Sequence, residues 1–591
     1  MRRVLKSACA LCAIVALALA ISACGGGGGG KDTGGGFGAL PSKQDTSGKR
    51  GGTLTVLNAS DVDSMDPAVT YYQFGFNVFF AIQRGLYGFE PDQQLEPSPD
   101  LADGPPQISS DGKTVTVKIK SGVKFSPPVN REVVSGDVKY AVERAFSKNI
   151  PAPYAGAYFG YIEGAPEAQA GPYKPISGIQ TPDDQTIVFK LTKPYGAELA
   201  GAMVLPITAP VPKEYASKFD KSNPSTYGTH QVFTGPYQVE NDKKGNLTGY
   251  EPKKLIKLVR NPNWDPKTDY RPAYLNEIDI REGNDDTVAA ARRVLRGKGL
   301  VVGDFAVPPD VLREASQKFD GQVLLPPTGG NRYISLNTQV KPFDDINVRK
   351  AVIAGIDRDA LRLTRGGPAI GEVATHFNAP GLPGFEEAGG VKGFPELDYL
   401  ANPKGDPKVS AKYFKAAGMK SGKYEGPAIS FAGDSDDPGN KTFLVAADQF
   451  RKLGFKLKTQ TAKHEDLVTE VCGTPKQKIA VCVNTGWLKD FNDALTMFDL
   501  TFNGKNIKPT NNNNYPELND PKVNAAIEKA SAETDLKARA KAWAEVDRAV
   551  MEAAPIVPYV WDKQGNARSK DVKGVVNRFN ATWDYSFTSI K

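Results

Sequence analysis

One apolar segment near the start of the chain limits how the rest can fold. Arg2, Arg3 and Lys6 precede an apolar run over residues 8–20, and small residues follow it. A basic head, a short apolar core and a small-residue cleavage site are typical of a secretory signal. The run is shorter than the ~20 residues that span a bilayer as a helix, and no later stretch is longer. We therefore predict a signal peptide over residues 1–23 and a mature chain that folds in water outside the cytoplasm.

A cysteine follows the predicted cleavage site. Residues 21–24 read Ile-Ser-Ala-Cys and resemble the bacterial lipobox, in which the cysteine thiol receives a diacylglyceryl group. The alternative is an ordinary signal in which Cys24 is incidental. Because two or more acyl chains hold a protein firmly at a membrane, we predict that Cys24 is a lipid anchor on the outer face of the cytoplasmic membrane.

A glycine-rich segment follows the predicted anchor. Residues 25–30 and 34–36 are all glycine. Such a segment cannot bury a core, and about 26 residues of Gly-rich coil reach roughly 28 Å from end to end. We predict a tether over residues 24–50, which lets the folded body move near the membrane surface.

The folded body carries little net charge. The chain has 74 basic and 67 acidic residues, a formal net charge of +7, and loss of three basic residues with the signal leaves +4. This charge is too small and too dispersed for a nucleic-acid-binding protein. About 540 residues follow the tether, which is more than one hydrophobic core holds, and they predict two or three lobes.

Two cysteines, Cys472 and Cys482, remain in the body after removal of the signal and the anchor. They flank a loop that leads into an expected strand over residues 479–484. In an oxidising compartment they can form one disulfide, and two buried free thiols are the alternative. The sequence leaves both states open.

Strand and helix patterns are mixed along the body. Residues 115–119 and 187–191 alternate apolar and polar side chains, which predicts half-buried strands. Apolar residues at helical spacing over 138–145 and 348–356 predict helices with one apolar face. Asp520-Pro521 places a capping side chain before a proline at the first helical position. We expect lobes of mixed α/β or α+β class.

Patterns typical of enzymes are absent from the sequence. The three histidines are scattered, and there is no His-Glu-x-x-His, Gly-x-Ser-x-Gly or phosphate-binding glycine loop. Residues 434–439 begin like a calcium loop, but Pro438 offers no side-chain ligand and Val445 stands where the closing Glu belongs. We predict no enzymatic activity, no cofactor and no metal site; an exported hydrolase is the alternative.

Several segments in series carry a resemblance to a known family. The most recognisable is Asp137–Arg144, with the sequence DVKYAVER. The other segments, in order, are residues 51–56, 66–67, 85–87, 111–114, 122–126, 234–237, 260–264, 337–358, 514–521 and 554–558. Together they resemble the solute-binding proteins of ABC importers, family 5, the dipeptide, oligopeptide and nickel-binding type. Arg131, Asn524 and Lys489–Asp493 depart from the family pattern, which weakens any transfer of ligand specificity.

The resemblance implies a fold of mixed α/β class, like the periplasmic binding proteins of type II. It has two large lobes joined by crossing strands at a hinge, and a smaller inserted lobe. The predicted division is residues 51–92, 206–331 and 557–591 for lobe I, 93–205 for inserted lobe II and 332–556 for lobe III.

The resemblance also implies a function. A solute is captured between the lobes, and the closed, monomeric form docks on an ABC permease with associated ATPases. Peptides are the expected ligand, bound in an extended conformation. The alternatives are a nickel complex, haem or an oligosaccharide on the same fold, or a signalling receptor without transport.

In peptide-binding relatives, a carboxylate shortly after a tryptophan pairs with the α-ammonium of the ligand. Asp490 matches that position after Trp487, and a charge-assisted bond suits the task. The alternative is that Asp490 caps a helix or pairs with Lys489. Asp493 is the competing carboxylate. The other predicted ligand-binding residues are Thr485, Gly486, Tyr71, Tyr72, Gln73 and Tyr154.

Overall fold

The computed structural model describes residues 36–37, 47–91, 97–577, 579 and 581–591. Residues from Gly36 on form one compact unit. The predicted signal peptide, Cys24 and most of the predicted tether lie outside the described residues and stay predictions. In the described part of the chain, no helix has the length and apolar character needed to span a membrane.

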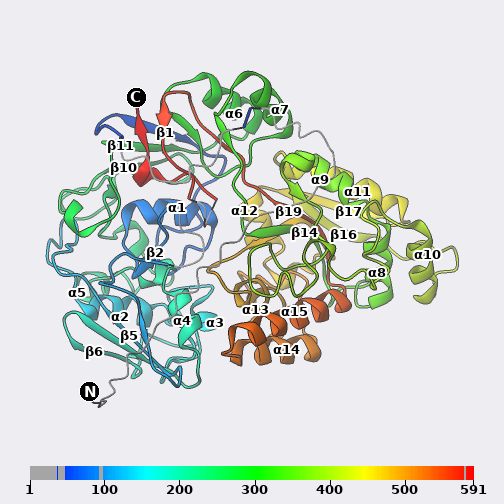
Figure 1. Cartoon of the computed structure of the whole chain (residues 1–591), viewed down its shortest axis with the longest axis horizontal. Helices are drawn as coiled ribbons and strands as arrows, with labels where there is room; N and C mark the ends of the chain where they lie inside the picture. Colours follow the sequence, from blue (N-terminus) through cyan, green and yellow to red (C-terminus); the bar gives the residue numbers. More distant parts are fainter. Residues whose placement is uncertain (1–35, 38–46, 92–96, 578, 580) are drawn as a thin grey trace, which may run out of the picture. The chain divides into compact units, whose positions relative to one another are not determined.

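The first sheet is mixed and has six described strands in the order β12-β1-β11-β10-β8, with β9 beside β10 (Figure 1). Their bounds are β1 Thr53–Leu57, β8 Tyr237–Val239, β9 Tyr250–Glu251, β10 Leu255–Arg260, β11 Glu277–Arg281 and β12 Leu300–Val302. β1 runs parallel to both β11 and β12. Leu54, Val56, Ile278 and Ile280 bury one face of the sheet in a core shared with helix α1, Gln73–Ile82. The carboxyl ends of the three parallel strands therefore meet at one edge.

The second sheet is antiparallel, in the order β4-β5-β7-β6. Its strands are β4 Gln107–Ile108, β5 Thr114–Lys118, β6 Ile179–Asp183 and β7 Thr186–Lys190, and the neighbouring helices are α2 Ser135–Arg144, α3 Ala155–Phe159, α4 Gly196–Ala202 and α5 Lys213–Ala216. The alternating pattern predicted β5 and β7 correctly, because Val115, Val117 and Phe189 are buried while their neighbours are not. The predicted helix over 138–145 is α2.

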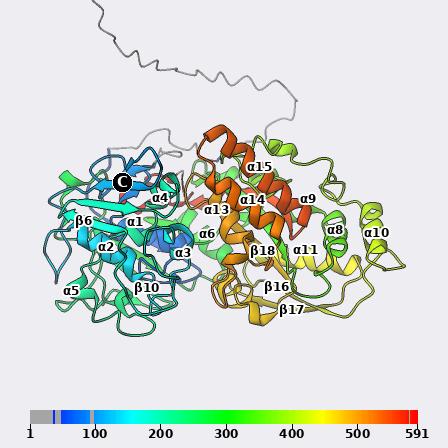
Figure 2. The same ribbon diagram turned by 90° about the horizontal axis from the view of Figure 1, so that it is seen from below.

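The third sheet has the order β15-β19-β14-β18-β16-β17. Its strands are β14 Gly330–Leu336, β15 Gly371–Glu372, β16 Ile429–Asp434, β17 Leu457–Ala462, β18 Val481–Leu488 and β19 Ile556–Asp562. β14 is antiparallel to β18 and β19, and β16 is parallel to β17 and β18. The connecting helices include α8 Ile346–Gly355, α9 Arg358–Arg365, α10 Pro407–Ala416, α11 Gly439–Lys452 and α12 His464–Asp466. Three more helices, α13 Leu495–Phe502, α14 Pro521–Ala532 and α15 Leu536–Ala553, pack together as one group (Figure 2).

Aspartate caps begin several of these helices. The Asp520 carboxylate accepts the N–H groups of Lys522 and Val523 at the start of α14, as the sequence predicted. Asp406 does the same for Lys408 and Val409 at the start of α10. Each cap stabilises its helix by about 1 kcal/mol, and the following proline loses no hydrogen bond at the first helical position.

The last part of the chain crosses the predicted boundary at residue 557, where lobe I was expected to resume. β19 spans this position and pairs with β14 in the third sheet, and the division into lobes stays a prediction. The chain leaves that sheet only after Asp562. β20, Asn566–Ala567, then pairs with β13, Val323–Leu324, and β21, Val572–Lys573, pairs with β22, Ser589–Ile590. The remaining helices are α6 Thr287–Arg296 and α7 Pro309–Lys318, which follow β11 and β12.

The structure joins Cys472 to Cys482 in a disulfide, with Cα atoms 6.3 Å apart. Of the two states that the sequence left open, this is the bridged one. The bond ties the segment after α12 to β18, the strand that leads to Asp490.

Candidate binding cavity

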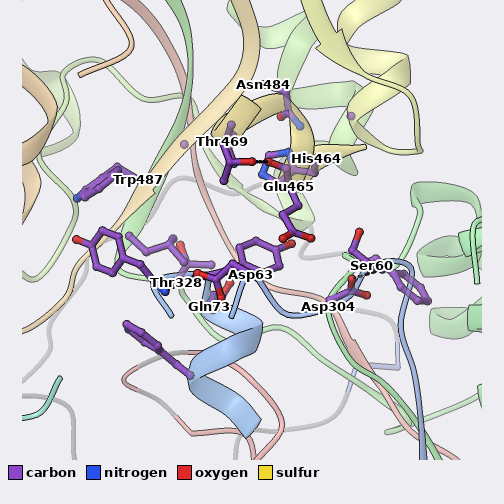
Figure 3. A pocket seen from close by; sticks show the side chains of 18 of the residues that line it. Ser60, Asp63, Gln73, Asp304, Thr328, His464, Glu465, Thr469, Asn484 and Trp487 are labelled. Atoms are coloured by element: carbon purple, nitrogen blue, oxygen red, sulfur yellow. Dashed lines mark hydrogen bonds between the residues drawn. The ribbon is translucent and has the colours of Figure 1, made fainter. Parts of the chain in front are cut away.

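A cavity of about 540 Å³ lies between the first and third sheets (Figure 3). Its volume falls in the range of small-molecule sites. Much of the lining comes from the carboxyl ends of strands in both sheets. The segments after β1 and β12 lie on one side, and the ends of β16 and β18 lie on the other. In open α/β sheets ligands bind at this edge, because the chain ends there in loops that carry polar side chains.

Asp490 follows β18 and lines the cavity. One of its carboxylate oxygens, Oδ2, accepts hydrogen bonds from the hydroxyls of Tyr71 and Tyr158, both at 2.6 Å. Burial raises the pKa of Asp490 to about 7, although the two hydroxyl donors act to lower it. The other oxygen accepts no hydrogen bond from a described residue. A buried carboxylate with one open oxygen is suited to receive a cationic hydrogen-bond donor.

Aromatic rings surround this carboxylate. The Tyr71 ring lies 4.8 Å from the ring of Tyr154 and 6.0 Å, edge on, from that of Trp487. Tyr158 packs edge on against Phe491 at 5.3 Å. The Trp487 indole donates its N–H to the carbonyl of Thr496 and so has a fixed orientation. The rings exclude water from Asp490, which strengthens any ion pair formed there.

Of the predicted ligand-binding residues, Tyr71, Tyr72, Gln73, Gly486, Trp487 and Asp490 line the cavity. Thr485 and Tyr154 are not among the lining residues, and their predicted roles in ligand binding stay predictions. Successive side chains of a strand point to opposite faces, and the buried hydroxyl of Thr485 donates to the Tyr333 carbonyl instead. Tyr154 is fully buried behind Tyr71.

Asp493, the competing carboxylate, is also absent from the lining. Arg539 binds it through Nε at 2.8 Å and Nη2 at 3.0 Å, and contacts Glu198 of α4 through Nη1 at 2.7 Å. Asp493 also accepts the N–H of Leu495 at the start of α13. It is therefore Asp493, and not Asp490, that accepts a backbone N–H group at the start of the helix. Lys489 donates to Asn492 at 2.8 Å and forms no ion pair with Asp490.

Two arginines in the lining share one buried carboxylate behind it. Asp562 accepts from Arg332 Nε at 3.1 Å and from Arg365 Nη2 at 3.0 Å. Burial acts to raise the pKa of Asp562, but the two guanidinium groups outweigh it and hold that pKa below its usual value. His464 Nδ1 lies 2.9 Å from Asp434 Oδ1. The two guanidinium groups and the His464 imidazole are thus all engaged by carboxylates of the protein.

Sequence reasoning missed several further acidic residues that line the cavity, among them Asp63, Asp304 and Glu465. Asp304 accepts the N–H groups of Ala59 and Ser60, both at 2.8 Å, and burial raises its pKa to about 6. Asp63 and Asp304 follow β1 and β12, so a parallel pairing of those strands would have placed them together. The sequence does not reveal that pairing.

Among the described residues, no group of three His, Cys, Asp or Glu side chains is placed to hold a metal ion. The residues of the calcium-like loop have other roles. Asp434 pairs with His464, and Asp437 pairs with Lys441 at 3.1 Å. Pro438 and Gly439 begin α11 at the cavity edge.

Comparison with known proteins gives a consistent result. Residues 96–509 match the family model described as bacterial extracellular solute-binding proteins, family 5 middle. The chain is 24% identical over 570 residues to the oligopeptide-binding protein OppA of Bacillus subtilis, covering 94% of each chain. It is similar to the structure of clavulanic acid biosynthesis oligopeptide binding protein 2, with 27% identity, a TM-score of 0.76 and coverage of 94% and 99%. OppA of Haemophilus influenzae in complex with the peptide RPPGFSPFR shares the fold, at 20% identity, a TM-score of 0.73 and coverage of 93% and 100%.

Proposed function

The chain belongs to the bacterial extracellular solute-binding proteins of family 5, and from this premise we propose that it captures peptides for an ABC importer. Members of the family bind solutes and do not convert them, so the prediction of a binding protein that is not an enzyme is confirmed. The predicted mixed α/β fold of the periplasmic-binding-protein type is confirmed as well.

One observation carries the proposal of a peptide ligand. Asp490 presents an open carboxylate oxygen to the cavity, while Tyr71 and Tyr158 hold the other oxygen. A free peptide N-terminus is an ammonium that fits this acceptor, and burial makes the bond selective for a charged donor. The named relatives OppA and oligopeptide binding protein 2 support peptides over other solutes.

The same contacts suggest how capture is coupled to closure. Tyr71 precedes α1 of the first sheet, Tyr158 lies on α3 beside the second sheet, and Asp490 follows β18 of the third. We propose that these sheets are the cores of the three predicted lobes. A ligand bound at Asp490 then stabilises the form in which the lobes meet, because only that form offers all the contacts.

Calorimetry of Asp490→Asn tests the peptide ligand. The wild type should bind a peptide with a free N-terminus, and N-acetylation or the Asn substitution should weaken binding several hundredfold, since removing one partner of a buried ion pair costs about 3–5 kcal/mol. Equal affinity for the free and acetylated peptide would contradict the proposal. Native mass spectrometry of the purified protein would then identify the class of solute.

Export and delivery complete the proposed function. We propose that Cys24 anchors the mature protein to the outer face of the membrane, where, as a monomer, it delivers its ligand to permease subunits with associated ATPases. Cys24→Ala should convert the membrane-bound protein into an uncleaved or a released form, which fractionation detects. Unchanged membrane retention would argue against the anchor.

A further inference from the structure

Three carboxylates form what we call the acidic wall of the cavity: Asp63, Asp304 and Glu465. Asp63 is held by the N–H groups of Tyr71 and Tyr72, at 2.6 and 3.1 Å, and Asp304 by two N–H groups after β1. Figure 3 shows the Glu465 side chain pointing from α12 toward these two. The wall therefore contains carboxylates from both sides of the cavity, two of them in fixed positions.

The basic side chains around the acidic wall have hydrogen-bond or ion-pair partners outside it. Their partners in the structure are Asp562 for Arg332 and Arg365, Asp434 for His464, Asp285 for Lys463, and Asn492 for Lys489. No described cation forms an ion pair with Asp63, Asp304 or Glu465. Burial, followed by the charge of nearby Asp63, raises the pKa of Glu465 to about 8. The charges of Asp63, Asp466, Asp61 and Asp304 thus add to the cost of burying a charged Glu465, and no ion pair of Glu465 with a described residue offsets it.

Two other buried groups indicate, independently, that this space receives polar ligand atoms. The Tyr515 side chain lines the same cavity and is 7% exposed, and its hydroxyl has no hydrogen-bond partner among the described residues. Asp490 is 8% exposed and keeps one oxygen open toward the cavity. Both residues line the cavity, and each has a polar atom that accepts or donates no hydrogen bond with a described residue, so each is placed to bond a polar atom of a ligand.

We propose that the acidic wall binds a cationic side chain of the ligand, so that the preferred peptides carry arginine or lysine in addition to a free N-terminus. This inference rests on the proposed peptide function and names its substrate class. A guanidinium presents five donors in a planar fork that matches carboxylates. A neutral side chain at the same place would leave the carboxylates desolvated and unpaired, which disfavours its binding.

Tripeptides that differ in a single charge test the proposal. Arginine is placed at the first, second or third position of an otherwise all-alanine tripeptide, and each peptide is compared with its citrulline counterpart, which keeps the shape and removes the charge. Calorimetry should show at least tenfold tighter binding of the arginine peptide for at least one position. Equal affinities at all three positions would overturn the proposal.

Variants test whether the acidic wall causes the preference for arginine over citrulline. Glu465→Gln should lower the ratio of arginine to citrulline affinity at least threefold, and Asp304→Asn is the second variant, in case the first does not fold. Glu528→Gln makes the same change at an exposed position of α14 and should leave the ratio as in the wild type. A ratio that is unchanged in both folded wall variants would overturn the assignment.

Different results would overturn the acidic wall and the proposed peptide function. Binding of neutral and cationic peptides with equal affinity, abolished by N-acetylation, would overturn the acidic wall and leave the proposed function standing. Failure of every tripeptide to bind would overturn the proposed function, and this inference with it.

Discussion

Two carboxylates in the loop between β18 and α13 are both largely buried, but they have different hydrogen-bond donors. Asp490 is held by the neutral hydroxyls of Tyr71 and Tyr158 and keeps one oxygen open to the cavity. Asp493 receives two bonds from the guanidinium of Arg539, which also binds Glu198 of α4.

The type of donor explains the difference in role. Hydroxyl donors satisfy hydrogen bonds but leave the charge of Asp490 uncompensated, so burial raises its pKa to about 7 and the site gains from a cationic ligand. A guanidinium compensates the charge of Asp493 and joins it to Glu198 beside the second sheet. Asp490 can therefore bind a cationic ligand, while Asp493 stabilises the folded state.

The largest effect on stability is expected at the Arg539 cluster. Arg539→Met leaves Asp493 and Glu198 without their cation, although their side chains are only 17% and 6% exposed. The free energy of unfolding at pH 7 should fall by about 3–5 kcal/mol, because removing one partner of a buried ion pair leaves an uncompensated charge. Urea unfolding measures this loss.

Lys529→Met is the matched control for that prediction. Lys529 pairs with Glu545 at 3.3 Å on the surface, with both side chains well exposed. Its removal should cost less than about 1 kcal/mol. If Arg539→Met cost no more than this control, the contrast between the two carboxylates would be wrong.

At high pH, Asp490→Asn should raise the free energy of unfolding, whereas Arg539→Met should lower it. The unfolded carboxyl titrates near ~3.9, whereas the folded one titrates at about 7. Between these values the unfolded chain has lost the proton and the folded chain retains it, so this group lowers stability as pH rises and its penalty is complete above pH ~7. The Asn variant removes the penalty.

Unfolding at several pH values measures that effect. The free energy of unfolding of the variant should exceed that of the wild type by up to about 4 kcal/mol at pH 8 and should match it at pH near 4. Asp103→Asn, at an exposed position, is the surface control. A difference that does not grow with pH would show that Asp490 is not the uncompensated carboxylate.

The smallest effect is expected at the tyrosine donors. Tyr158→Phe and Tyr71→Phe each remove one 2.6 Å hydrogen bond to Asp490, worth about 1.5–3 kcal/mol to the charged form. The pKa of Asp490 should rise, and the midpoint of peptide binding against pH should move up by about 1 unit. Tyr154→Phe should leave the midpoint unchanged, since its hydroxyl does not contact Asp490. Equal midpoints in all three variants would contradict this account.

Local patterns in the sequence predicted local structure. The alternation over 115–119 and 187–191 predicted β5 and β7, and Asp520-Pro521 predicted the start of α14. Asp490 was predicted from its distance to Trp487 in a family pattern. The sequence did not show which face of β18 carries Thr485, because Asn484 has a φ of 62° and the pairing with β14 shifts register between Tyr333 and Ser335. The face on which each side chain lies depends on that register, which the flanking sequence does not contain.

By itself, the sequence determined the class of the protein: the mixed strands and helices and the family. It also proposed Asp490 as an anchor for a ligand, but only the tertiary structure decided which charged side chains line the cavity. Asp63, Asp304 and Glu465 are far apart in the chain and meet because parallel strands end at one edge and two sheets face each other. Recognition depends on where charges lie relative to one another and on which of them the protein has already paired. Both are properties of long-range contacts, and no local pattern of residues encodes them.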